Sequence, residues 1–207
     1  MAKEGIPFLL IALLLALAAR FLLPGKFVFP AFFLLFAAFV AFFFRDPERK
    51  PPEGAGLVVS PADGLVVYAG PTDGGHFFSG PAEKVSIFMS LFDVHVNRAP
   101  LSGVVEKIVY NKGKFFRADV DKASLENEQN WVIMRDGERK FAFVQIAGLV
   151  ARRIVCKVRE GDRLEKGQRV GLIMFGSRVD VYLPPGTSLR VRKGDRVRAG
   201  ESVIGEL

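Results

Sequence analysis

Hydrophobic positions follow two different patterns along the chain, and the pattern changes near residue 45. Residues 6–19 and 27–44 form two long apolar runs without a charged side chain, separated by the turn-forming Pro-Gly-Lys of 24–26. A helix needs about 20 apolar residues to cross a hydrocarbon core of about 30 Å. The second run is close to that length, and the first reaches it only if Arg20 extends its charge to the lipid interface. The pattern predicts a helical membrane hairpin over residues 1–45.

Basic residues flank this hairpin, with Lys3 before it and Arg45, Arg49 and Lys50 after it. Positively charged flanks favour the cytoplasm, so both termini and the rest of the chain are expected on the cytoplasmic face of the cell membrane, although Lys26 in the turn reduces the contrast. A cleaved signal peptide fits less well, because a second apolar run follows at once. One span with an interfacial helix stays open.

After a polar, proline-rich linker at 46–55, residues 56–207 alternate in short β-branched runs bounded by Gly, Pro and Asp. These runs predict strands at 56–60, 64–68, 84–89, 103–110, 130–134, 140–146, 153–158 and 179–183. Residues 147–152 have room for a short helix only. The length suits one globular domain. We therefore expect an all-β domain, a barrel or sandwich.

A repeated turn motif adds a detail of topology. Residues 160–173 and 193–205 both read Gly-Asp-x-x-x-x-Gly followed by an apolar strand. The glycines permit positive φ, and the Asp can bond to its own backbone. The motif resembles the turns of biotinyl- and lipoyl-type β-barrels, which is a likeness of fold that implies no chemistry.

Composition and charge narrow the function classes. Half of the residues are hydrophobic, and 11 of the 20 phenylalanines lie in the first 45 residues, which favours contact with lipid. The net charge of +7 is scattered rather than clustered, so it favours anionic lipid headgroups over a nucleic acid. The single cysteine, Cys156, excludes an intramolecular disulfide and is expected to be a small core residue. Two histidines are too few to favour a metal site.

Four segments carry the chemical information. They are Phe-Phe-Arg-Asp-Pro-Glu-Arg at 43–49, Val-Val-Ser-Pro-Ala-Asp-Gly at 58–64, Phe-Met-Ser-Leu-Phe-Asp-Val-His-Val-Asn-Arg-Ala-Pro at 88–100, and Gly-Leu-Ile-Met-Phe-Gly-Ser-Arg-Val-Asp at 171–180. A Gly-Ser pair alone is an ordinary turn. In this order, however, the four segments resemble the short-form phosphatidylserine decarboxylases, and the likeness extends from Phe43 to about Tyr182.

The resemblance implies an enzyme made as a proenzyme. The chain would break its own Gly176–Ser177 bond, leaving a β chain of residues 1–176 and an α chain of 177–207 that begins with a pyruvoyl group derived from Ser177. This covalent group would be the cofactor, without a metal or pyridoxal phosphate. The two chains would remain partners, no nucleic acid is expected to bind, and a homo-oligomer is left open.

The chemistry explains why the resemblance places a Gly-Ser pair there. Ser177 Oγ would attack the Gly176 carbonyl, where glycine leaves the approach open, and an ester would replace the amide. Loss of the Ser177 α-proton would eliminate the ester to dehydroalanine, which hydrolyses to the ketoacyl group. In the family an Asp-His pair assists the first step, and the matching aspartate is Asp63. The local Pro-Ala-Asp-Gly sequence is equally typical of a turn.

His95 lies in the matching histidine motif. The better-known family pattern has two histidines three residues apart, of which the first serves decarboxylation and the second assists self-cleavage. His95 matches the first, and Arg98, which cannot act as a base near neutral pH, occupies the place of the second. Either His95 performs both tasks, which is our expectation, or Asp63 activates Ser177 directly or through water. His76 matches no motif and is expected in a loop.

The resemblance also implies turnover of a membrane phospholipid. The serine amine of phosphatidylserine would form a Schiff base with the pyruvoyl carbonyl, carbon dioxide would leave, and His95 would protonate the carbanion to give phosphatidylethanolamine. Among the nearby arginines, Arg98 and Arg178 are the candidates for binding the lipid phosphate.

Two other interpretations stay open. An archaeal-type ether phosphoserine lipid would undergo the same headgroup chemistry. A non-enzymatic, membrane-anchored adaptor or carrier barrel would share the strands and the repeated turn, although the Met-Lys-Met tip of a carrier is absent and such a protein would remain one intact chain. A soluble amino-acid decarboxylase is disfavoured by the hairpin.

Overall fold

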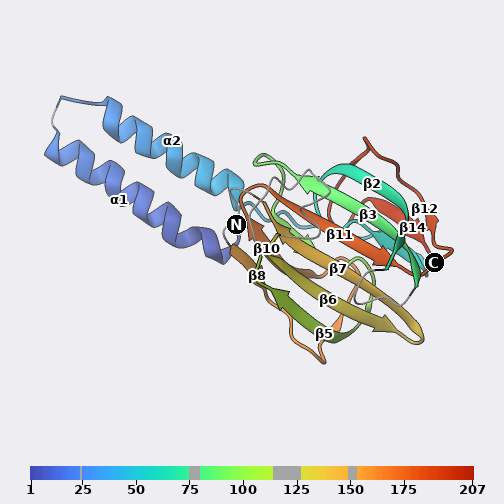
Figure 1. Ribbon diagram of the computed structural model, residues 1–207. Helices are drawn as coiled ribbons and strands as arrows, with labels where there is room; N and C mark the ends of the chain where they lie inside the picture. The colour runs from blue at the N-terminus through green and yellow to red at the C-terminus, as the bar shows by residue number, and fades with distance from the viewer. Residues whose placement is uncertain (24, 75–79, 114–126, 149–152) are drawn as a thin grey trace. The chain divides into compact units, whose positions relative to one another are not determined.

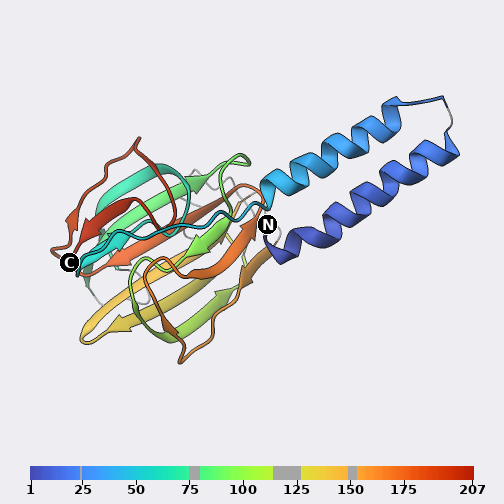
Figure 2. The same ribbon diagram turned by 180° about the vertical axis from the view of Figure 1, so that it is seen from behind.

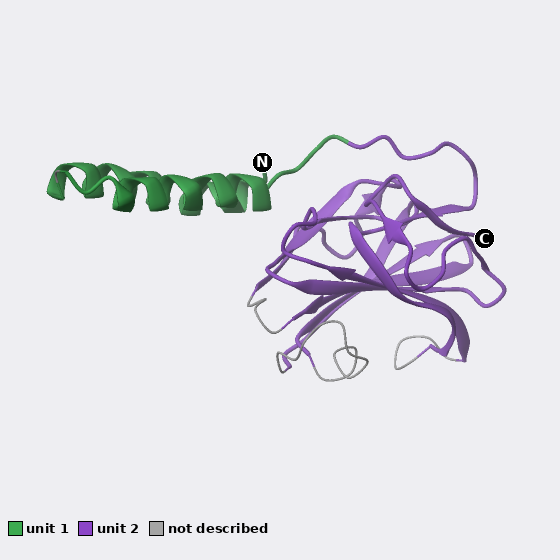
Figure 3. Ribbon diagram, turned by 90° about the horizontal axis from the view of Figure 1, so that it is seen from above, with its two compact units in different colours: residues 1–48 green, residues 49–207 purple. Residues whose placement is uncertain are grey.

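The chain divides into two compact units, residues 1–48 and 49–207, which are coloured separately in Figure 3. The computed structural model describes the whole chain except residues 24, 75–79, 114–126 and 149–152. The loop expected around His76 therefore lies outside the described residues, as does most of the short helix considered at 147–152.

Unit 1 is a pair of apolar helices, α1 (Ile6–Leu22) and α2 (Val28–Phe43), preceded by the short 3-10 helix η1 (Lys3–Gly5). Small side chains of α1 face α2 and are buried, whereas most of the leucines and phenylalanines are exposed. Among the described residues, only the helix Lys3–Leu22 is long and apolar enough to cross a membrane, and α2 is shorter. The sequence favoured residues 27–44 as the membrane span instead, because residues 6–19 are too short unless the helix continues through Arg20. In the structure α1 does continue through Arg20.

Unit 2 is built from strands, which confirms the all-β expectation (Figures 1 and 2). The strands are β1 (Leu57–Val59), β2 (Gly64–Asp73), β3 (Pro81–Met89), β4 (Val96–Arg98), β5 (Gly103–Asn111), β6 (Gln129–Asp136), β7 (Arg139–Ala147), β8 (Arg153–Cys156), β9 (Arg163–Leu164), β10 (Arg169–Met174), β11 (Ser177–Leu183), β12 (Ser188–Leu189), β13 (Arg196–Val197) and β14 (Val203–Glu206). Each of the eight predicted strands is present. The short strands β4, β9, β12 and β13 were not predicted.

Three sheets make up the unit. The largest has the order β13-β2-β3-β11-β7-β6-β5-β9, and the two smaller ones have the orders β4-β10-β8 and β1-β14-β12. Strand β11 therefore lies between β3 and β7, antiparallel to both. Strand β10, which immediately precedes β11 in the chain, belongs to a different sheet. The chain thus changes sheets between Met174 and Ser177.

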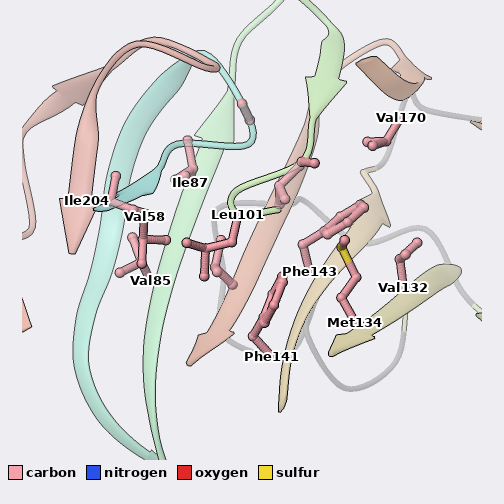
Figure 4. Close-up of a cluster of buried hydrophobic side chains, with 14 of the residues drawn as sticks. Val58, Val85, Ile87, Leu101, Val132, Met134, Phe141, Phe143, Val170 and Ile204 are labelled. Carbon is pink, nitrogen blue, oxygen red and sulfur yellow. The ribbon is translucent and has the colours of Figure 1, made fainter. Parts of the chain in front are cut away.

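Both faces of the largest sheet are covered by side chains. The main cluster includes Val58, Val85, Ile87, Phe141 and Phe143 (Figure 4). A second cluster, including Trp131, Ile146 and Tyr182, uses the alternate positions of β6, β7 and β11. This explains why these strands read as nearly continuous apolar runs. Cys156 is partly buried against the main cluster, in line with its expected packing role.

The repeated turn motif forms two equivalent turns, as predicted. Gly161 and Gly194 have φ of 90° and 101°, and Gly167 and Gly200 have φ of 79° and 74°. Each copy then contributes a two-residue strand that pairs with the start of a long strand, β9 with β5 and β13 with β2. The two copies thus occupy matching positions at the ends of the largest sheet.

Candidate active site

Ser177 is the first residue of β11, and its side chain is fully buried. It pairs with Met89 of β3 on one side and with Ala147 of β7 on the other. Its hydroxyl donates to the Met89 thioether, with 3.4 Å between Oγ and Sδ. Because two ladders fix the serine backbone, the point from which its side chain projects is set by the sheet rather than by a loop.

The backbone before Ser177 adopts an uncommon conformation. Phe175 and Gly176 have φ of 65° and 40°, and Phe175 is the one non-glycine residue with a positive φ in the described part of the chain. This left-handed conformation costs a residue with a side chain about 1–2 kcal/mol. A Cβ added to Gly176 would meet no atom within 4 Å, so there is open space beside this residue. Strain and access therefore coincide at the predicted cleavage bond.

His95 is buried directly before β4. Its main-chain oxygen accepts a hydrogen bond from the Ile173 amide at 3.4 Å, which ties it to the end of β10 that leads to Ser177. Its ring Nδ1 lies 3.0 Å from the Asp93 carbonyl oxygen. Since a carbonyl only accepts, Nδ1 carries the proton in the neutral ring, and Nε2 is then the basic nitrogen.

Asn97 connects β4 to the surroundings of Ser177. Alternation along an extended chain places His95 and Asn97 on the same side of this segment. The Asn97 amide donates to the same Met89 sulfur that Ser177 contacts, at 3.7 Å. The histidine segment and the serine strand therefore meet at Met89.

Asp63 lies in a different environment. Its Oδ2 is 3.0 Å from Arg49 Nη2, and its Oδ1 accepts the Ala199 amide at 2.7 Å. In the equivalent turn, the Ser102 hydroxyl accepts the Lys166 amide at 3.0 Å in the same way. One oxygen of Asp63 thus serves a turn, the kind of role that its local sequence also allowed, and the other pairs with Arg49.

Arg98 points to the repeated turns. Its guanidinium donates to the Gly167 carbonyl at 2.9 Å, and a Cβ added to Gly200 would lie 2.9 Å from its Cδ. It lines an open hollow of about 420 Å³ together with Lys166 and Arg169. Because three residues of strand span about 10 Å, Arg98 is further from the Ser177 end of β10 than His95 is.

Arg178 is buried on the face of the sheet opposite to Ser177. It donates to Asp180 at 2.6 Å and to Ser86 at 2.7 Å, and Lys84 lies 3.0 Å from the second Asp180 oxygen. Burial alone raises the pKa of Asp180, but the charges of Arg178 and Lys84 outweigh it and bring the pKa below its ordinary value. The contacts of Arg178 are those of an internal ion-pair cluster.

Residue types alone did not single out Met89, which contacts Ser177, or Asn97 and Gln145, which connect to Ser177 through Met89. Asn97 and Gln145 are fully buried side-chain amides, and Gln145 interrupts the apolar run Phe-Ala-Phe-Val-Gln-Ile-Ala of β7. A polar residue that interrupts such a run is a signal that could have identified Gln145. Within the described ranges, no group of three or more His, Cys, Asp and Glu could hold a metal ion.

Comparisons with known proteins agree on one family. The family model described as phosphatidylserine decarboxylase matches residues 36–205. Proteins named phosphatidylserine decarboxylase proenzyme from Desulfotalea psychrophila and Syntrophus aciditrophicus are each 47% identical to this chain, and one from Citrifermentans bemidjiense is 49% identical. The alignments cover 99–100% of this chain and 96% of each relative.

Proposed function

The chain belongs to the phosphatidylserine decarboxylase family, and we propose that it is a membrane-bound, pyruvoyl-dependent enzyme that converts phosphatidylserine to phosphatidylethanolamine. The family makes it a decarboxylase, a carbon–carbon lyase, and sets aside the non-enzymatic adaptor. The relatives are named as proenzymes, which supports maturation by cleavage into two chains.

The observation that carries the maturation step is the left-handed backbone of Phe175 and Gly176 immediately before a buried serine. Cutting the chain after Gly176 removes the sheet constraint that holds these residues in this conformation. The strain is therefore released by cleavage at this bond. This supports Gly176–Ser177 as the bond that breaks.

The residues present fit the formation of a pyruvoyl group. Ser177 Oγ forms a bond to the Gly176 carbonyl carbon, its proton passes to His95 Nε2, and the C–N bond breaks as His95 returns the proton to the Ser177 nitrogen. The Ser177 α-proton is then removed and the Cβ–Oγ bond breaks, leaving a carboxylate on Gly176 and a dehydroalanine at residue 177. The dehydroalanine rearranges to an imine, which water hydrolyses to the pyruvoyl group and ammonia. His95 is favoured over Asp63 as the base, because both Asp63 oxygens already accept hydrogen bonds.

In turnover, the pyruvoyl group supplies an electrophilic carbonyl that accepts the electron pair released when the substrate carboxylate leaves as carbon dioxide. His95 then donates a proton to the substrate carbon, and its Nδ1 contact with Asp93 holds the ring in the required tautomer. Burial of His95 excludes bulk water from this proton transfer.

The surface of unit 1 supports a membrane location. Both helices expose apolar side chains over most of their surface, with Phe21 73% and Val28 76% exposed. Such surfaces are stable in lipid rather than in water. The basic flanks of the helices support an orientation with the decarboxylase unit on the cytoplasmic face, where the headgroup of a lipid substrate is accessible.

Intact-mass analysis of the purified full chain tests the proposal. It should give two fragments, residues 1–176 and 177–207, and the smaller should lack a free amine and react with a carbonyl-specific hydrazine. Vesicles of diester phosphatidylserine should release carbon dioxide, and vesicles of the ether analogue test the second lipid class. A single full-length mass in an active preparation would contradict the proposal.

A further inference from the structure

A row of three buried amide side chains crosses one face of the largest sheet toward Ser177. Asn130 of β6 pairs in register with Gln145 of β7, and Asn130 Nδ2 donates to Gln145 Oε1 at 3.0 Å. Gln145 Nε2 donates in turn to Asn97 Oδ1 at 2.9 Å. None of the three side chains is more than 2% exposed.

The row ends at the sulfur of Met89. Asn97 Nδ2 donates to Met89 Sδ at 3.7 Å, and Ser177 Oγ donates to the same sulfur at 3.4 Å. Each hydrogen bond in the row fixes which end of the amide is the oxygen and which is the nitrogen. The Asn97 oxygen accepts from Gln145, so the Asn97 NH₂ group has one orientation, toward Met89. The sulfur is thus held between an amide and the serine hydroxyl.

Stability alone does not require this arrangement. Buried amides lose their hydration, and the hydrogen bonds between them only offset that loss. Apolar side chains of the same size would fill the space at similar free energy. A connected polar row that specifies one arrangement of side chains is better explained by a demand for fixed geometry at its end.

We propose that Asn97, Gln145 and Asn130 are positioning residues that hold Met89 against Ser177 and thereby fix the serine oxygen for attack on the Gly176 carbonyl. A thioether accepts a hydrogen bond weakly and takes no proton. The hydroxyl hydrogen can therefore rotate toward a base at little cost while the oxygen stays in place. This role rests on the proposed self-cleavage.

The substitution Met89→Leu tests the contact, because it keeps the apolar volume and removes the sulfur. Newly synthesised chain should convert to the two fragments between about tenfold and a hundredfold more slowly than the unsubstituted chain, as expected for a misplaced nucleophile. Met134→Leu is the matched control, since Met134 is equally buried in the same cluster and has no contact with Ser177 among the described hydrogen bonds. It should convert at the unsubstituted rate.

A double-substitution cycle tests whether Asn97 acts through Met89. Asn97→Ala should slow conversion in the unsubstituted chain but cause no further slowing when Met89→Leu is already present. Melting temperatures of the same variants in an uncleavable Ser177→Ala chain report their effect on folding separately. If the double variant instead slows conversion by the product of the two single effects, Asn97 and Met89 act independently, and the proposed connection between them is overturned.

Turnover by the mature protein separates positioning from general damage. After maturation residue 177 no longer carries the hydroxyl, so in cleaved Met89→Leu molecules the decarboxylation rate per pyruvoyl group should fall by a smaller factor than the conversion rate does. Equal conversion rates of Met89→Leu and the unsubstituted chain would overturn this inference while leaving the proposed function intact. Absence of fragments from the unsubstituted chain would instead overturn the proposed function.

Discussion

His95 and Asp93 form a contact that determines which nitrogen of the imidazole is basic. Nδ1 of His95 lies 3.0 Å from the Asp93 carbonyl oxygen, so Nε2 carries the lone pair of the neutral ring. The position of that carbonyl is itself fixed, because the Asp93 carboxylate accepts both the amide and the hydroxyl of Ser90, at 2.8 and 2.7 Å. A tight turn thus orients the proposed acid–base group.

Replacing His95 by Gln should stop both reactions. Gln keeps a donor and an acceptor but moves no proton, so conversion to fragments and turnover of any mature fraction should each fall by at least about a hundredfold. Fragment formation is followed by intact mass, and turnover by release of carbon dioxide from phosphatidylserine vesicles. His76→Gln, at a histidine outside the family motifs, is the control. Normal fragmentation with lost turnover would assign self-cleavage to a different base.

Replacing Ser177 by Ala should leave one intact chain without activity. The methyl group has no oxygen to attack Gly176, and no pyruvoyl group can form. The expected result is a single mass for residues 1–207 and no carbon dioxide release. Ser188→Ala, at an exposed serine of the same predicted α chain, should mature and turn over normally. Turnover by the Ser177→Ala protein would contradict the mechanism.

Replacing Gly176 by Ala separates local access from backbone strain. Gly176 and Gly186 both have positive φ, 40° and 83°, and an added Cβ meets no atom within 4 Å at either position. Each alanine should therefore destabilise the fold by a similar amount, about 1 kcal/mol. Only Gly176→Ala should slow fragment formation, because its methyl group stands beside the carbonyl under attack. Equal cleavage rates for the two variants would argue against this approach of the nucleophile.

The sequence was sufficient for the eight predicted strands because short β-branched runs bounded by Gly, Pro and Asp are a local signal. Strand β4 could not be found in this way, since Val96–Arg98 is short and has two polar residues, and only its pairing with β10 makes it a strand. The serine and histidine were identified by resemblance to a family. Their buried surroundings depend on contacts such as Gln145 with Asn97, which are 48 residues apart.

Asp63 and Arg98 illustrate the limit of motif matching. A motif specifies a residue type, but the partners of its side chain come from distant turns, here Ala199 for Asp63 and Gly167 for Arg98. The turns that contain Lys166 and Ala199 are copies of one repeat. Ser102 accepts the Lys166 amide as Asp63 accepts the Ala199 amide, which indicates that the two side chains share the task of holding a turn. The roles assigned to Asp63, Arg98 and Arg178 from the resemblance remain predictions.

Packing of the two helices of unit 1 should depend on small side chains. Ala16 is buried between α1 and α2, whereas Ala18 on the same helix is exposed. Ala16→Leu should separate the helices and increase proteolysis of the loop between them in detergent, because close approach in an apolar solvent requires small residues. Ala18→Leu should have no such effect. Equal sensitivity of both variants would contradict this packing.

Asp180 should stabilise the proenzyme through its charge. Asp180→Asn leaves the buried Arg178 without its anion, and the free energy of unfolding at pH 7 should fall by about 3–5 kcal/mol. Glu106→Gln is the control, because the exposed pair with Arg135 should contribute at most about 1 kcal/mol. Urea unfolding of the Ser177→Ala chain, followed by fluorescence of the single tryptophan, Trp131, measures both.

The pH dependence of this effect identifies its origin. The pKa of Asp180 lies below the ordinary 3.8 in the folded protein, so its stabilising contribution is complete above pH 3.8 and is lost as the pH falls through the folded pKa. The difference between Asp180→Asn and the parent should therefore be constant from pH 7 to about pH 4 and shrink at lower pH. A difference that persists unchanged to pH 2 would mean that packing, rather than the carboxylate charge, stabilises this cluster.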